Sequence, residues 1–156
     1  MIIEPTTLPE IKTRLNASQR RHLANIAGTN TQLGRRTVIV RPGESIQVAI
    51  EGLNNSGGGI VLLKQGTHRL TASLSGRTRV SIIGEGRDTT IIEANGSAYG
   101  ITYSGSGGNI ANFELRDFTL QNSNNTYGID IIACDFYRVE NVRVTSCDQG
   151  GIRFSR

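Results

Sequence analysis

The feature that most constrains the fold of this chain is an internal repeat of about 24 residues. Residues 113–120 read FELRDFTL and residues 137–144 read YRVENVRV, with the same order of apolar and polar positions. A second series places a glycine before an apolar residue at Gly100-Ile101, Gly128-Ile129 and Gly151-Ile152. Such a period, built from short alternating strands, is typical of a solenoid. Each turn of a solenoid buries its apolar side chains only against the turns above and below it.

The positions of glycine and proline favour strands over a helical bundle. The chain has 19 glycines, which suit turns between many short strands. Its three prolines all precede residue 43, so the rest of the chain keeps every backbone N–H that a strand ladder needs.

The two repeats also predict how one turn closes. The polar doublets Arg116-Asp117 and Glu140-Asn141 stand at matching places between apolar pairs. A bend at these doublets would direct the apolar residues of both flanking strands toward one axis. Three strands per coil then close a turn, with Ile129 stacked between Ile101 and Ile152.

The remaining elements follow from apolar runs and capping signals. Ser45 is a helix N-cap residue, and it predicts a capping helix over about 45–53 that contains Ile46, Val48, Ala49, Ile50 and Leu53. Strands are predicted at 37–40, 60–63, 68–70, 80–83, 90–92, 101–103, 113–120, 129–131, 137–144 and 152–154.

Residues 1–36 are predicted to form a separate, helical and basic arm. Thr7 and Glu10 form a capping box, and an apolar stripe follows at Ile11, Leu15, Leu23 and Ile26. The arm carries the whole net charge of +4, because the other 120 residues hold 11 basic and 11 acidic side chains. We expect the arm to dock on a partner chain or on copies of itself, with Arg14, Arg20 and Arg21 on its polar side. An ordinary solvated face explains these arginines as well.

Several classes of function are disfavoured. The arm has no aromatic residue to stack bases, so we expect no nucleic-acid binding. Cys134 and Cys147 lie 13 positions apart, which is not metal-ligand spacing, and we expect two small buried thiols. No signal peptide or membrane-length apolar run is present, so we expect synthesis in a reducing cytoplasm and no membrane insertion.

Residues 41–92 resemble a known protein family. RPGESIQVAI at 41–50, GGGIVLL at 57–63, Gly66-Thr67, VSIIGEG at 80–86 and TII at 90–92 follow in this order. This succession resembles the start of pectate-lyase-like right-handed parallel β-helices, above all those of bacteriophage tailspikes and tail fibres. The resemblance implies an all-β, right-handed parallel β-helix over 37–156, with three strands per coil and the helix as an N-terminal lid. It also implies a homotrimer.

No catalytic constellation is evident within residues 1–156. β-Helix enzymes that cleave polysaccharides need converging carboxylates, and the candidates are Asp117, Asp130, Asp135, Glu140 and Asp148. The register places Asp130 on the outside opposite Arg153, and Glu114 opposite Arg138, which favours structural charge pairs between coils. Asp135 and Asp148 fall in turns, where aspartate is common for backbone reasons. We expect no metal and no cofactor, and the sequence leaves open whether the protein is an enzyme.

The leading hypothesis is the N-terminal part of a trimeric phage tail fibre or tailspike. The last repeat stops after one strand at Arg156, so we expect a longer protein. Made in the host cytoplasm and resident in the virion tail, it would bind tail or adaptor proteins through its arm. A distal region would recognise or degrade a host surface glycan. The alternatives are a free polysaccharide lyase, hydrolase or epimerase, and a bacterial adhesin or fibre of another injection machine.

Overall fold

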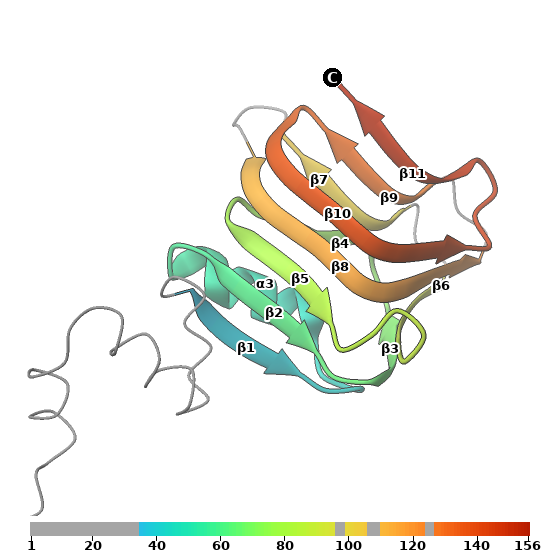
Figure 1. Cartoon of the computed structure of the whole chain (residues 1–156), viewed down its shortest axis with the longest axis horizontal. Coiled ribbons are helices and arrows are strands. Elements are labelled where there is room, and N and C mark those ends of the chain that lie inside the picture. Colours follow the sequence, from blue (N-terminus) through green and yellow to red (C-terminus); the bar gives the residue numbers. More distant parts are fainter. Residues whose placement is uncertain (1–34, 96–98, 106–109, 124–126) are drawn as a thin grey trace, which may run out of the picture. The chain divides into compact units, whose positions relative to one another are not determined.

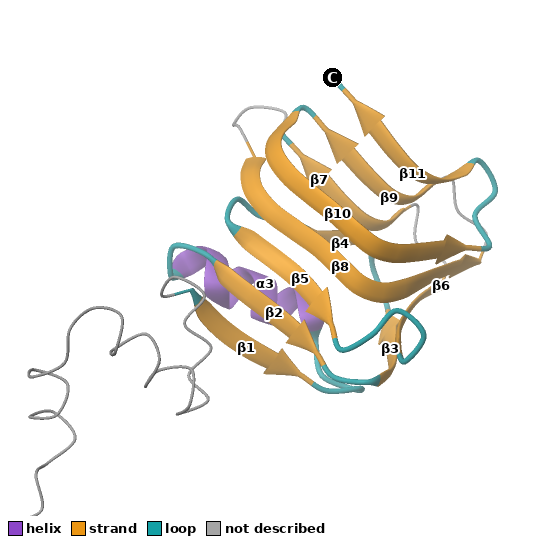
Figure 2. Ribbon diagram, in the orientation of Figure 1, coloured by secondary structure: helices purple, strands orange, loops and turns teal. Residues whose placement is uncertain are grey.

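The computed structural model describes residues 35–95, 99–105, 110–123 and 127–156. The chain divides into two units between Arg35 and Arg36. The helix predicted for the arm lies outside the described residues, and the fold below is that of the second unit, Arg36–Arg156 (Figures 1 and 2).

This unit consists of short strands and one described helix. Its elements are β1 (Arg36–Val40), α3 (Ile46–Asn55), β2 (Gly59–Leu63), β3 (Gly66–Leu70), β4 (Leu74–Ser75), β5 (Val80–Gly84), β6 (Thr90–Asn95), β7 (Tyr99–Ser104), β8 (Ile110–Ser123), β9 (Tyr127–Ile132), β10 (Cys134–Thr145) and β11 (Gly150–Ser155). Each predicted strand lies within an observed one. Strand β4 was not predicted, because its two residues are too few to show an alternating pattern.

All described strand pairs are parallel, and they form three faces around one core. β1, β2, β5 and the first halves of β8 and β10 make the first face. β3, β6 and the second halves of β8 and β10 make the second face. β4, β7, β9 and β11 make the third. The fold is a right-handed parallel β-helix of about four turns with three strands per coil, as predicted (Figure 1).

The predicted bends lie at the polar doublets. β8 and β10 each run without interruption from the first face into the second. Within them, Asp117 and Asn141 adopt left-handed backbone conformations with φ of 60° and 49°, which aspartate and asparagine tolerate better than most residues. The Asn141 side chain donates a hydrogen bond of 2.8 Å from Nδ2 to Asp117 Oδ1, so the two bends also support each other across the coils.

Residues in register stack into columns that fill the core. The third face stacks Leu74, Ile101, Ile129 and Ile152, which confirms the predicted order of the three isoleucines. The second face stacks His68, Ile92, Leu120 and Val144. Burial of each aliphatic side chain stabilises the fold by about 1.5–3 kcal/mol, so the columns supply most of the driving force for coiling.

An aromatic stack crosses between the coils, from the buried Tyr103 and Phe113 to the exposed Tyr137 and Phe154. The rings of Tyr103 and Phe113 are nearly parallel, with centroids 3.7 Å apart, and Tyr137 and Phe154 continue the stack at 5.5 and 5.7 Å. The Tyr103 hydroxyl is buried and donates to the Val80 carbonyl oxygen at 3.0 Å. Burial raises the pKa of this hydroxyl, so it remains a neutral donor.

Helix α3 packs against β1 and β2 through an apolar face. Ser45 is its N-cap, and its hydroxyl accepts a hydrogen bond from the Val48 N–H at 3.3 Å. Ile46, Ile50 and Leu53 of the predicted capping helix are buried, together with Ala49. Val48 belongs to the helix but is 72% exposed, because at helical spacing it falls on the side away from the core.

Candidate functional site

The carboxylate of Asp130, on the third face, is fully buried and paired with an arginine. Arg153, one coil further on, donates from Nε to Oδ1 at 2.8 Å and from its terminal nitrogen to Oδ2 at 2.6 Å. The guanidinium also lies over the Tyr127 ring, 4.5 Å from its centroid. The predicted pairing between coils is confirmed. Asp130 lies on the outer side of its strand, as the register predicted, but its exposed fraction is 0% because the arginine covers it.

The second predicted charge pair forms differently. Glu114 and Arg138 stand opposite each other in register, as expected. Their ion pairs instead run along each strand, from Glu114 to Arg116 at 3.9 Å and from Arg138 to Glu140 at 2.8 Å. Residues two apart on a strand share one face, so long side chains reach along the strand as easily as across it.

The five candidate carboxylates do not form one catalytic group. Asp117 supports the bend and Glu140 pairs with Arg138 at the corner of the first two faces, whereas Asp130 belongs to the third face. Asp135 and Asp148 are exposed and, in the described chain, make no hydrogen bond or ion pair with their carboxylates. Among the described residues, no three His, Cys, Asp or Glu side chains are grouped so that they could hold a metal ion.

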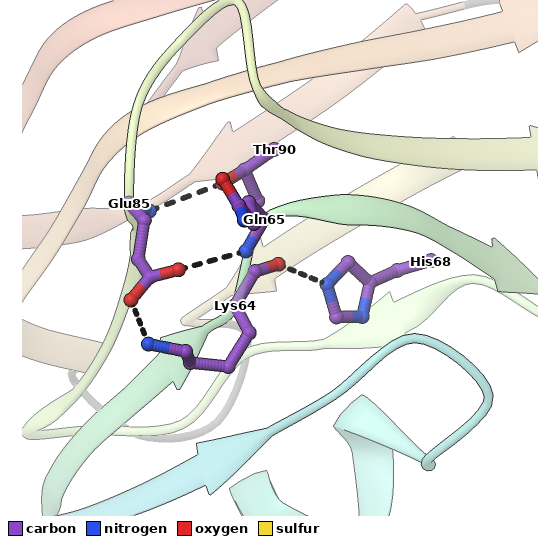
Figure 3. Close-up of polar contacts among 5 residues, drawn as sticks. All are labelled: Lys64, Gln65, His68, Glu85 and Thr90. Atoms are coloured by element: carbon purple, nitrogen blue, oxygen red, sulfur yellow. Dashed lines mark hydrogen bonds and ion pairs between the residues drawn. The ribbon is translucent and has the colours of Figure 1, made fainter.

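A polar network joins the first two coils at the corner between the first and second faces (Figure 3). Glu85, after β5, forms an ion pair with Lys64 and accepts the Gln65 N–H at 2.9 Å. The Glu85 N–H donates to the Thr90 hydroxyl at 3.1 Å. The hydrogen bond from Lys64, followed by that from the Gln65 N–H, holds the pKa of Glu85 below its ordinary value of 4.5. This corner therefore carries a carboxylate that stays ionised and fixes two successive turns to each other.

His68 lies next to this network but inside the core (Figure 3). Its ring is 2% exposed, and Nε2 lies 2.8 Å from the Lys64 carbonyl oxygen. A carbonyl oxygen only accepts, so Nε2 donates this hydrogen bond. Nδ1 is buried and has no hydrogen-bond partner among the described residues.

A hollow of about 260 Å³ lies beside His68. It is lined by Gly43–Gln47 at the start of α3 and by residues 68–74 of β3 and the following turn. The structure thus brings a helix N-terminus and a buried imidazole to one cavity. This arrangement was not predicted from the sequence. His68 falls at an apolar position of the strand pattern, and this position could have indicated a buried imidazole.

A larger hollow, of about 680 Å³, lies where β9 passes into β10 and beside the end of β11. Cys134, Asp135, Tyr137 and Phe154 are among the residues that line it. Neither Cys134 nor Cys147 forms a disulfide, and both are half-buried, so the expectation of two buried thiols holds only in part. Burial raises the pKa of the Cys134 thiol, which leaves it a weak nucleophile.

The residues predicted to dock the arm lie outside the described ranges. These are Ile11, Arg14, Leu15, Arg20, Arg21, Leu23 and Ile26. Within the described part of the chain, no helix combines the length and the apolar character that crossing a membrane requires.

Comparisons with known proteins return two similar solved structures. No protein-family model matches the chain, and a search of curated proteins finds no match. Among solved structures, it is similar to the A-module of the Azotobacter vinelandii mannuronan C-5 epimerase AlgE6, with 21% identity and a TM-score of 0.44 over 65% of this chain. The A-module of AlgE4 from the same organism gives 20% and 0.44 over 70% of this chain.

The chain spans 38% and 40% of the lengths of these two modules. At such identity and TM-score, the likeness carries no inference about substrate or chemistry.

Proposed function

We propose that this chain is a structural β-helix module of a phage tail fibre or tailspike, and that residues 1–36 attach it to the tail. The observation that carries the proposal is what the carboxylates of the chain contact. Glu85, Asp117, Asp130 and Glu140 are each held by a side chain or backbone group that stabilises a corner or a face of the coil. A general acid or base must come within hydrogen-bond reach of its substrate. Among the five candidate carboxylates, Asp135 and Asp148 are exposed without such a contact in the described chain, and they lie at opposite ends of β10 rather than together.

The distribution of charge supports the attachment role. The arm carries an excess of +4, whereas residues 37–156 are neutral. A basic segment attached to a neutral coil suits association with an acidic protein surface. Arg14, Arg20 and Arg21 are the side chains that would make this contact, and the resemblance to tailspikes suggests three copies in one assembly.

The proposal is tested on particles made at the native locus. Tail particles are banded on a density gradient and probed for the full-length chain, and light scattering of the purified chain gives its oligomeric state. We expect the chain to band with tail proteins as a trimer. Reversing the arm charges with R14E, R20E and R21E should abolish co-banding, while the matched coil variant Arg138→Glu should leave it unchanged.

A different result would overturn the proposal. A monomeric chain that stays at the top of the gradient and cleaves or epimerises an acidic polysaccharide would identify a free enzyme. Retention of the triple arm variant on the particles would show that the arm does not make the attachment.

A further inference from the structure

The outer surface of the first face is built from two columns of side chains (Figure 1). Val61, Ile82 and Leu115 of this face belong to the core, so the residues before and after them on each strand point outward. The register stacks these outward residues coil upon coil. Column A consists of Thr37, Ile60, Ser81, Glu114 and Arg138, and column B of Ile39, Leu62, Ile83, Arg116 and Glu140.

The two upper coils of this surface carry charges in a checkerboard. Column A has Glu114 and then Arg138, and column B has Arg116 and then Glu140. Within the chain, Glu114 pairs with Arg116 at 3.9 Å and Arg138 with Glu140 at 2.8 Å. All four side chains remain accessible, from 32% exposed for Arg116 to 63% for Arg138. Each can therefore meet a charge of another molecule while it keeps its partner on the strand.

The lower coils of the same surface are apolar. On the outer side, Ile39 is 47% exposed and Leu62 is half-buried. Ile60 and Ile83 stand beside them but are only 5% and 7% exposed, so they support this patch from within. An exposed apolar patch bordered by charged residues is typical of a protein–protein contact.

The two columns complement each other when two copies meet face to face with parallel coils. A rotation axis parallel to the coil keeps every residue at its height and brings column A of one copy against column B of the next. Glu114 then meets Arg116 of the neighbouring copy, and Arg138 meets its Glu140. Each charged level pairs opposite signs across the contact, and neither pairs like signs. An unrelated partner would not require this match between the two columns of one surface, whereas a second copy does.

We propose that the outer first face binds a second copy of this chain, side by side and with parallel coils. This inference rests on the trimer of the proposed function and names the surface that holds its coils together, because the same contact closes a pair or a ring of three. Five strands about 4.8 Å apart make the face about 20 Å tall, which is less than the roughly 800 Å² per partner of a standard interface requires. We therefore expect reversible association in the micromolar range. Arms attached to one tail would raise the local concentration and make the contact persist.

Charge reversal in the full-length chain tests the proposal by sedimentation velocity over a range of concentrations. Glu114→Arg with Glu140→Arg makes the four charged positions basic, and Arg116→Glu with Arg138→Glu makes them acidic. We expect each double variant alone to self-associate about tenfold or more weakly than the wild type, because like charges would face each other. An equimolar mixture of the two variants should restore association in pairs, because opposite charges then meet.

Two further variants control for folding and for total charge. The chain with all four substitutions exchanges the signs but keeps the checkerboard, so it should self-associate like the wild type. Glu93→Arg breaks the pair with Arg69 on the second face, where the two side chains lie 2.8 Å apart, and it should leave self-association unchanged. Circular dichroism shows whether each variant is folded. Where a double variant does not fold, Glu114→Arg and Arg116→Glu replace the two doubles, with the same expected loss alone and recovery on mixing.

Three outcomes would overturn the inference. These are a wild-type chain that stays monomeric throughout the range, folded double variants that self-associate as the wild type does, and a mixture that associates no better than its components. The attachment role is judged separately, because co-banding with tail particles depends on the arm. The double variants should still band with the particles, and an arm variant that bands with them would count against the attachment role alone.

Discussion

Replacement of Arg153 by methionine tests whether a charge pair between coils stabilises this fold. The substitution keeps an unbranched side chain and removes both hydrogen bonds to Asp130, which is 0% exposed. Removal of one partner from a fully buried pair costs about 3–5 kcal/mol, and a surface pair contributes about 0–1 kcal/mol. The Arg153 side chain is 35% exposed, so water would reach the carboxylate in part. We therefore expect a loss of about 2–3 kcal/mol, part of it from the contact with the Tyr127 ring.

Urea unfolding of the full-length chain, followed by circular dichroism at neutral pH, measures this loss. The matched control is Arg138→Met, which breaks the pair with Glu140 on a side chain that is 63% exposed. We expect the control to change the free energy of unfolding by less than about 0.5 kcal/mol. A double-mutant cycle that adds Asp130→Asn separates the pairwise energy from the effect of each substitution alone.

Equal destabilisation by Arg153→Met and Arg138→Met would show that the pair between coils does not stabilise this face. A coupling energy near zero in the cycle with Asp130→Asn would show the same. Either result would mean that the buried carboxylate is solvated well enough without its arginine, and that the columns of apolar side chains alone determine the stability of this face.

Substitutions at Gly84, Asn141 and Glu85 test the corners and the close approach of the coils. Gly84→Ala should destabilise the chain by about 3 kcal/mol or more, because its Cβ would lie 2.2 Å from the Asp117 carbonyl oxygen. The control Gly52→Ala lies in α3, where the added Cβ would meet no atom within 4 Å, and it should stabilise the chain by about 0.5–1 kcal/mol. Equal urea midpoints for the two variants would contradict the expected clash at Gly84. Asn141→Ala should lower the free energy of unfolding by about 1–2 kcal/mol, because it removes the hydrogen bond to Asp117 and places alanine in a left-handed conformation. Asn141→Gly should recover part of that loss in the same assay, because glycine adopts this conformation without strain. The pKa of Glu85 lies below its ordinary value of 4.5, so its contribution to stability is present above that pH and is lost as the pH falls through the lowered value. Glu85→Gln should remove this part of the acid sensitivity in a pH titration of unfolding, and an unchanged titration would show that the carboxylate is not coupled to folding.

Much of the fold could be read from the sequence because the repeat is local and periodic. Residues 113–120 and 137–144 reproduce each other, and the structure pairs them in that register. The bends at Asp117 and Asn141 were also predictable, since both residues tolerate left-handed backbone and both follow a polar neighbour. Ser45 marked the start of the helix, because a serine hydroxyl accepts a backbone N–H of the first helical turn.

The side-chain environments were harder to predict. Alternation along a strand says which face a residue lies on, and it placed Asp130 on the outside correctly. It does not say what covers that face. Arg153 and Tyr127 meet over Asp130 only because two coils stack, so the burial of the carboxylate comes from another turn of the chain.

The amino-acid sequence by itself determined the coil: its period, its three strands per turn, its bends and the helix at its start. These follow from alternation, glycine placement and capping, which act over a few residues. Only the tertiary structure decided which polar groups meet, such as Glu85 with Lys64, and His68 with the Lys64 carbonyl oxygen. The pair of Glu85 and Lys64 joins residues about one coil apart, where the twist of the sheet and the reach of each side chain set the distances.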